Sequence, residues 1–150
     1  MTKKIFLIVS FLFVAVIIAG CSDGKIKTNG VTGTVTYDGS PLAGATVIFS
    51  PVTDGQGNPA VGETDEKGVY VLQTILGNFG AGTTPGDYTV TVTKTELKKT
   101  GKKTTDGDGV VHEETKPVSV IPEKYAQAAT SGFTATVKSG SNTFDFNLEK

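Results

Sequence analysis

Apolar and polar residues alternate along most of the chain beyond residue 30. In the clearest stretch, Tyr88, Val90 and Val92 are separated by threonines. A period of two is typical of a half-buried β-strand, because successive side chains of a strand point to opposite faces of a sheet. The same pattern predicts seven short strands, at about residues 31–37, 45–50, 61–64, 69–74, 88–93, 133–138 and 144–149.

Turn-forming residues separate these stretches, and no long helical periodicity interrupts them. Asp38-Gly39 and Pro85-Gly86 are typical turn pairs, and a tight turn is expected at 65–68. A further turn at 139–141 predicts that the last two strands form a hairpin. Only residues 122–129 could hold a helical turn or two. The sequence therefore predicts an all-β fold, a seven-stranded antiparallel β-sandwich.

The first 20 residues have a different character. Lys3 and Lys4 precede a 15-residue apolar run, Ile5 to Ala19, which is the layout of a secretory signal peptide. A membrane-spanning helix needs about 20 apolar residues, so a removable signal is favoured over a permanent transmembrane segment. Residues 1–20 are therefore expected to be absent from the mature protein.

The end of this leader, Ile18-Ala19-Gly20-Cys21, resembles the lipobox of bacterial lipoproteins. The resemblance implies cleavage between Gly20 and Cys21, and attachment of diacylglycerol and a fatty acid such as palmitate to the cysteine. No other cofactor is expected. Two or more acyl chains hold a protein stably on a membrane, whereas one does not. The alternative is an ordinary signal peptide followed by a free thiol.

Residues 21–30 are interpreted as the lipidated cysteine and a polar tether. Residues 31–150 then form one β-sandwich domain. In enterobacterial lipoproteins the residue after the cysteine influences sorting, and aspartate there retains the protein in the inner membrane. Ser22 at this position favours the outer membrane or the cell surface.

Composition and net charge limit the classes of partner that the chain is expected to bind. The formal net charge is −1 and all 14 basic residues are lysines, so nothing indicates nucleic-acid binding. Without arginine, the chain has no guanidinium to bind a phosphate at two points. The single cysteine excludes an internal disulfide. We expect a monomer that is held on a membrane by its lipid, with an envelope protein or glycan as the candidate partner.

Several segments together resemble the carboxypeptidase regulatory-like domains, a transthyretin-like (prealbumin-like) family. They are residues 33–47, 64–70 and 85–92 and the ending from 121 to 146. The resemblance implies an Ig-like sandwich of the Greek-key type that serves as a non-catalytic structural or interaction module of the cell envelope. The alternative is a carbohydrate- or peptide-binding accessory module of a surface system.

The chain lacks the residues that several enzymatic reactions need. His112 is its one histidine and arginine is absent, whereas transthyretin-like 5-hydroxyisourate hydrolases have several histidines, an arginine and a Tyr-Arg-Gly-Ser C terminus. A zinc peptidase needs more His and Glu ligands. A Ser-His-Asp arrangement needs a rigidly held histidine. We therefore expect no catalytic residues and no enzymatic activity.

Asp106 and Asp108 alternate with glycines, as oxygen ligands do at the start of a calcium-binding loop. The following residues, Val110 to His112, lack the later oxygen donors, and only Glu113 and Glu114 come after them. A plain turn is therefore favoured over a metal site.

Residues 95–116 form the most individual segment, too long for a minimal hairpin connection. Its first half carries Lys98, Lys99, Lys102 and Lys103, and its second half carries four acidic residues. The favoured interpretation is a solvated, mobile loop whose two arms attract each other across a glycine-rich tip. The alternative is a contact loop for a partner or an anionic surface polymer.

Aromatic residues complete the candidates. Tyr37, Tyr70 and Tyr88 lie in predicted strands, where packing explains them, while Tyr125 is not assigned. Sugar-binding sandwiches present flat, exposed aromatic rings, and tryptophan is absent. A Lys–Asn isopeptide crosslink is disfavoured because no lysine lies on the inward face of the first strand.

Overall fold

The computed structural model describes residues 27–75 and 80–150. These residues form twelve β-strands and one short 3-10 helix, η2 (Glu123–Ala126), so the all-β prediction is confirmed. The leader, Cys21 and most of the tether lie outside the described residues. Within the described part of the chain, no helix is long and apolar enough to cross a membrane.

The first sheet is built around β1 (Val31–Tyr37). Along one edge, β1 pairs antiparallel with β2 (Ser40–Pro41) and β5 (Val69–Val71). Along the other edge it pairs parallel with β11 (Asn142–Thr143) and β12 (Phe146–Leu148). Both parallel pairs keep the same register, so β11 and β12 act as one interrupted strand.

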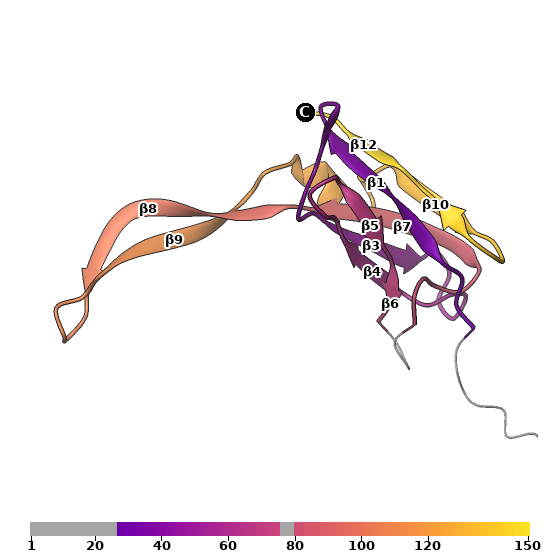
Figure 1. Ribbon diagram of the computed structural model, residues 1–150, viewed down its shortest axis with the longest axis horizontal. Coiled ribbons are helices and arrows are strands. Elements are labelled where there is room, and N and C mark those ends of the chain that lie inside the picture. Colours follow the sequence, from indigo (N-terminus) through magenta and orange to yellow (C-terminus); the bar gives the residue numbers. More distant parts are fainter. Residues whose placement is uncertain (1–26, 76–79) are drawn as a thin grey trace, which may run out of the picture.

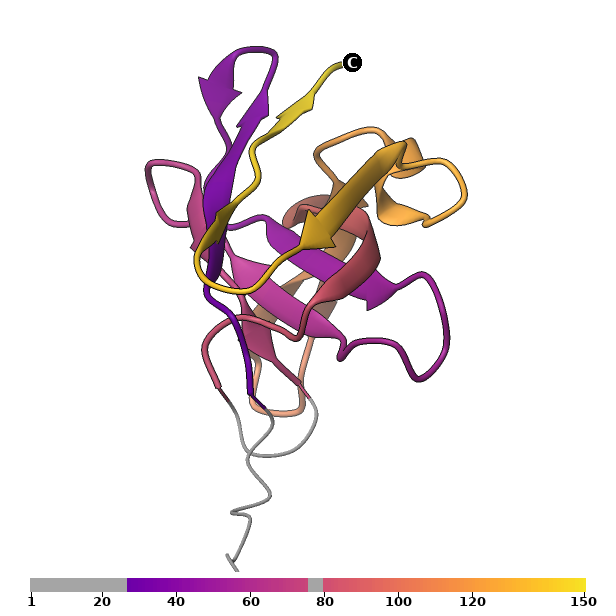
Figure 2. The same cartoon turned by 90° about the vertical axis from the view of Figure 1, so that its right-hand side faces the viewer.

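The second sheet has the order β10-β7-β3-β4-β6 and is antiparallel throughout. Its strands are β3 (Thr46–Pro51), β4 (Ala60–Glu63), β6 (Gln73–Thr74), β7 (Gly86–Thr93) and β10 (Phe133–Val137). The stretch 69–74 changes sheet at the buried residue Leu72, because β5 belongs to the first sheet and β6 to the second. Figure 2 shows the two layers from the end opposite the projecting strands.

The two sheets enclose one hydrophobic core, and the inward residues are those that the alternation predicted. Val31 and Val35 face inward from β1, and Val47, Phe49 and Val90 face inward from the second sheet. The Phe49 ring is fully buried, with ring centroids 5.8 Å from Tyr88 and 6.2 Å from Phe146. Burial of such side chains stabilises each by about 1.5–3 kcal/mol relative to exposure.

The predicted hairpin at the C terminus is wrong. β10 pairs with β7 in the second sheet, whereas β11 and β12 run parallel to β1 in the first. The turn between them carries the chain from one sheet to the other, so Phe133 and Phe146 meet across the core with centroids 5.0 Å apart. Alternation fixes which side chains point inward, but it does not fix which strand lies alongside.

Residues 95–119, which we call the arm, leave the sandwich entirely (Figure 1). They form a separate antiparallel ribbon of β8 (Thr95–Thr105) and β9 (Val111–Ser119). The interpretation as a loop is therefore wrong for most of this segment. A strand with polar residues on both faces shows no contrast between alternate positions, so the pattern that reveals half-buried strands does not reveal it.

Candidate functional site

The predicted site residues fall into two groups. Gly20 and Cys21, the expected cleavage and lipidation positions, lie outside the described residues. Lys98, Lys99 and Lys102 are all on β8, together with Lys103, and all four are exposed. The arm is therefore the part of the structure where the predicted contact residues can be placed.

The ladder of the arm determines how its side chains are distributed. At its base, the Val120 N–H donates to the Lys94 carbonyl oxygen at 2.9 Å. Hydrogen-bonded and non-hydrogen-bonded pairs alternate along an antiparallel ladder. In the observed register, Lys98 opposite Lys116 is then a hydrogen-bonded pair, and Leu97 opposite Pro117 is not.

Alternation gives the arm two faces. The Lys116 face is the side of the arm on which Lys116 lies, and its lysines and glutamates are Glu96, Lys98, Lys102, Glu114 and Lys116. The Glu113 face is the opposite side, and it includes Leu97, Lys99, Lys103, Val111, Glu113 and Pro117.

Two of the four predicted lysines are in ion pairs with β9. Lys99 Nζ lies 2.7 Å from Glu113 Oε2, and Lys102 Nζ lies 4.0 Å from Glu114 Oε2. The expected attraction between the two halves of this segment is present. Exposed pairs of this kind contribute about 0.2–1 kcal/mol each, so they align the strands without holding them firmly.

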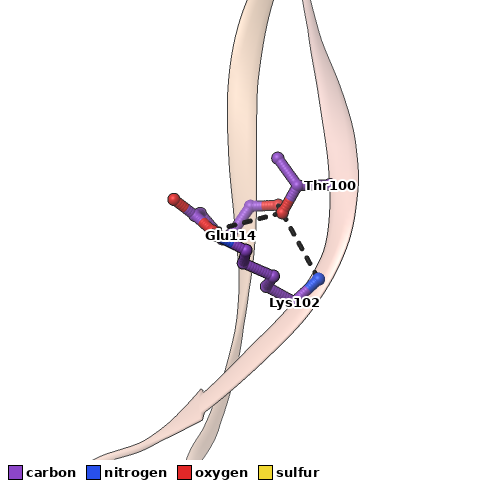
Figure 3. Close-up of polar contacts among 3 residues, drawn as sticks. All are labelled: Thr100, Lys102 and Glu114. Atoms are coloured by element: carbon purple, nitrogen blue, oxygen red, sulfur yellow. Dashed lines mark hydrogen bonds and ion pairs between the residues drawn. The ribbon is translucent and has the colours of Figure 1, made fainter.

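A bulge interrupts the ladder opposite Glu114. Thr100 Oγ lies 3.1 Å from the Glu114 carbonyl oxygen and 3.3 Å from its carboxylate, and the Lys102 N–H donates to Thr100 Oγ at 3.3 Å (Figure 3). Gly101 takes a positive φ of 79°, which a side chain would disfavour. The bulge brings Lys102 and Thr100 to the same glutamate.

Lys98 and Lys116 face each other directly across the ladder. Within the part of the chain that the structure describes, neither ammonium group has a carboxylate within 4.0 Å. Like charges directly opposite each other destabilise a strand pair. The Lys116 face therefore carries positive charge that the arm itself leaves unneutralised.

The tip of the arm is a turn stabilised by Asp106. Its Oδ1 accepts hydrogen bonds from the N–H groups of Asp108 and Val110, at 3.1 and 2.8 Å, and its Oδ2 lies 2.8 Å from His112 Nε2. The hydrogen bond with His112 is the main cause that lowers the pKa of Asp106. The Asp106 carboxylate thus has a structural role in the turn. Among the residues that the structure describes, no group of His, Cys, Asp and Glu side chains is arranged to hold a metal ion.

Both edges of the arm discourage the addition of another strand. Because Pro117 is in a non-hydrogen-bonded pair, its nitrogen lies on the outer edge of β9, where it offers no N–H. On the β8 edge, lysines and the bulge at Gly101 interrupt the row of backbone groups. Charged residues, proline and bulges are the usual protection of exposed edges. The two faces are therefore the surfaces of the arm that its edges leave open to contact.

Tyr125, which the sequence left unassigned, packs inside the protein. It is 6% exposed, its ring stacks on Phe133 with centroids 5.3 Å apart, and its hydroxyl donates to the Glu149 carbonyl oxygen at 3.2 Å. Tyr70 and Tyr88 are fully buried. None of these three rings is available to stack on a sugar.

Sequence reasoning missed a shallow groove of about 550 Å³ where β4 and β5 come together. Apolar and acidic side chains line it, including Val61, Glu63, Asp65, Val69 and Val71. Val71 is 56% exposed. These residues come from both sheets, and most of them lie between residues 61 and 73, where the alternation predicts strands but not how the two sheets meet.

Comparisons with known proteins give no family. No protein-family model matches the chain, and no curated protein matches it significantly. Among solved structures, a DUF3823 family protein from Parabacteroides merdae is 14% identical with a TM-score of 0.39, covering 83% of this chain and 47% of its own. A 9R-lipoxygenase from Cyanothece is 14% identical with a TM-score of 0.40, and the match covers 82% of this chain and 16% of the lipoxygenase chain.

The chain thus spans less than half the length of either protein. Likeness at this level supports no argument about function. The resemblance to carboxypeptidase regulatory-like domains is not confirmed by any match.

Proposed function

We propose that this chain is a lipid-anchored cell-envelope protein whose sandwich carries the arm as a contact element. The leader and the residues before Cys21 support the anchor. The arm supports the contact role and is the observation that carries the proposal. Its eleven-residue strand β8 extends about 35 Å at roughly 3.3 Å per residue, with almost all of its side chains exposed.

The proposed family is the carboxypeptidase regulatory-like, transthyretin-like group, with a role in structure or interaction and no catalysis. The segments quoted above support this assignment, and the two sheets around one core are compatible with it. The arm is an insertion between β7 of the second sheet and η2. Loops and insertions on a rigid scaffold are where binding residues are usually found.

The anchor is tested by the N-terminal peptide of the native protein. Trypsin should release residues 21–25 with the mass of Cys21 carrying diacylglycerol and an acyl chain, and a Cys21→Ser variant should leave the membrane fraction. An unmodified N terminus on a membrane-bound protein would exclude the lipid anchor.

The contact role is tested by removing the arm. Glu96 and Val118 are opposite each other in the ladder, so residues 97–117 can be replaced by Asn-Gly, the preferred two-residue hairpin turn. Both proteins are made from Ser22 onward, which keeps every residue of both sheets. We expect the chain with its arm to co-sediment with purified envelope fragments. The armless variant should stay in solution, with an unchanged melting temperature. Equal sedimentation of both would contradict the role of the arm.

The groove supports the second candidate function, a carbohydrate- or peptide-binding accessory module. Exposed Val71 beside Glu63 and Asp65 offers an apolar surface with negative charge, which suits a basic peptide better than a neutral sugar. Binding on a peptide and glycan array that persists in the armless variant and is lost in Val71→Asp would favour this function. Thr134→Asp, at an exposed position of β10 that does not line the groove, is the matched control.

A further inference from the structure

We propose that the Lys116 face of the arm binds an anionic glycan of the cell envelope, with Lys98 and Lys116 as its principal contacts. This inference rests on the proposed function, because it names the partner of the arm. Its starting point is the pair of lysines that oppose each other in the ladder with no carboxylate within 4.0 Å in the described part of the chain.

The acidic residues leave Lys98 and Lys116 without a carboxylate within 4.0 Å in the described part of the chain, although Glu96 and Glu114 lie on the same face. Glu113 pairs with Lys99 on the opposite face, and Glu114 is shared between Thr100 and Lys102. The Asp106 carboxylate is engaged by its own turn and by His112. An external anion beside Lys98 and Lys116 would relieve the repulsion between two like charges whose Cα atoms are about 5.5 Å apart in such a pair.

The exposure of these lysines indicates a polymer. A lysine is a single-point contact for an anion, and an exposed charge pair contributes at most about 1 kcal/mol. One small anion would therefore bind too weakly to matter. A chain of repeated anionic groups can engage Lys98, Lys116 and Lys102 together, so that each contact raises the effective concentration for the next.

The direction of the arm favours a glycan over the lipid surface. In Figure 1 the tip of the arm and the start of the described chain lie at opposite ends of the long axis, and in Figure 2 the arm points away from the viewer behind the sheets. The proposed anchor precedes the start of the described chain. The tip of the arm is then far from the point where the chain leads to the proposed anchor, within reach of polymers that lie beyond the lipid surface.

Local charge has to carry this binding, because the whole chain has a formal net charge of −1. Lys103 is eight residues along β8 from Thr95, which corresponds to about 25 Å in an extended strand. The charge of the sandwich is screened over about 8 Å at physiological ionic strength. The middle of the arm can therefore attract an anion that the protein as a whole does not.

The experiment compares two double variants of the chain from Ser22 onward. K98Q/K116Q removes two positive charges from the Lys116 face, and K99Q/K103Q removes two from the Glu113 face. The probes are polygalacturonate and dextran sulfate, with neutral dextran of equal length as control. Binding is measured by titration calorimetry at low and physiological salt, and circular dichroism checks the fold of each variant.

We expect the wild-type chain to bind both anionic polymers but not dextran, more weakly as salt rises. K98Q/K116Q should weaken binding about fivefold to tenfold, the equivalent of two exposed charge contacts, while K99Q/K103Q changes it less than about twofold. Equal losses in the two variants would show a net-charge effect and overturn the proposal. Absence of binding to the anionic polymers would overturn it as well.

Two further probes test the class of partner. Tighter binding to vesicles containing anionic lipid, or to polyglutamate, than to the glycans would overturn the choice of a glycan.

Failure of this inference can be distinguished from failure of the proposed function. If the armless variant loses envelope association but K98Q/K116Q keeps it, the arm remains a contact element and the assigned face and partner are wrong.

Discussion

The sandwich and the arm are built from strands of the same chain, but they are stabilised in different ways. In the sandwich, Val35, Phe49 and Val90 are completely buried, and each strand packs against the opposite sheet. In the arm, Leu97 is 71% exposed and Val111 is 57% exposed. The arm depends on its own ladder, its ion pairs and its turn.

This difference predicts two levels of stability. An isolated two-stranded ribbon is marginal in water because it has no hydrophobic face to bury. Local opening of the arm should therefore need much less free energy than unfolding of the sandwich, which unfolds as a unit. Hydrogen exchange should reach the amides of β8 and β9 long before those of β3 and β7.

The largest effect is expected from Gly33→Ala in β1. An added Cβ would overlap the carbonyl oxygen of Phe144, a backbone atom that cannot move aside without separating β1 from β11 and β12. We expect a loss of more than about 3 kcal/mol in the free energy of unfolding, or no folding at all. Chemical denaturation followed by circular dichroism measures it.

Gly101→Ala in the arm is the matched control. Gly101 has a positive φ but nothing within 4 Å of an added Cβ, so the strain of about 1–2 kcal/mol should appear only as faster exchange in the arm. If Gly101→Ala lowered the stability of the sandwich as much as Gly33→Ala, the two regions would form one cooperative unit.

An intermediate effect is expected from Tyr70→Phe. The Tyr70 hydroxyl donates to the Phe144 carbonyl oxygen at 2.7 Å, so its loss should cost about 1 kcal/mol at pH 7. Burial, followed by the negative charge of Asp145, raises the pKa of Tyr70 well above its usual range. The folded protein therefore keeps this group protonated where the unfolded chain begins to ionise, at about pH 10.

A raised pKa in the folded state stabilises the fold fully below the pKa of the unfolded chain, and this contribution is lost as pH rises. The wild type should lose stability above about pH 10 more steeply than Tyr70→Phe, and the gap at pH 7 should narrow. Urea denaturation at pH 7 and just above about pH 10 measures the difference in the free energy of unfolding between wild type and Tyr70→Phe. Tyr37→Phe is the control. A gap that widens with pH would refute the role of burial.

The smallest effect is expected at the tip of the arm. The pKa of Asp106 is lowered, chiefly by the hydrogen bond with His112, so the turn is stabilised above the normal aspartate pKa and loosens as pH falls below about 4. Asp106→Ala should speed exchange of the Val110 amide at neutral pH without changing global unfolding. Asp108→Ala, on the same turn, should leave that amide protected; equal exchange in both variants would contradict the assignment.

The sequence predicted the inward residues of the sandwich well, because burial of one face produces the alternation seen in β7. It did not predict the neighbours of each strand. A turn such as 139–141 is compatible both with a hairpin and with a step between sheets, and only the packing of Phe133 against Phe146 distinguishes them. The predicted count of seven strands is not confirmed for a related reason, since the stretch 69–74 divides into β5 and β6.

The candidate site was less predictable than the fold. The four lysines of residues 98–103 were identified as candidate contacts, but Lys116, which completes the proposed face, was not. Its importance depends on a register that the bulge near Gly101 shifts. The groove between β4 and β5 depends on a crossing of two sheets, which the alternation of any one strand does not record.

The parallel pairing of β1 with β12 has a consequence for biogenesis. β12 closes one edge of β1, and paired residues such as Thr36 and Asn147 are 111 positions apart in the sequence. Contacts so distant in sequence form late and slow folding. The first sheet therefore cannot be completed until β12 is available, so a partly synthesised chain that lacks β12 keeps one edge of β1 open.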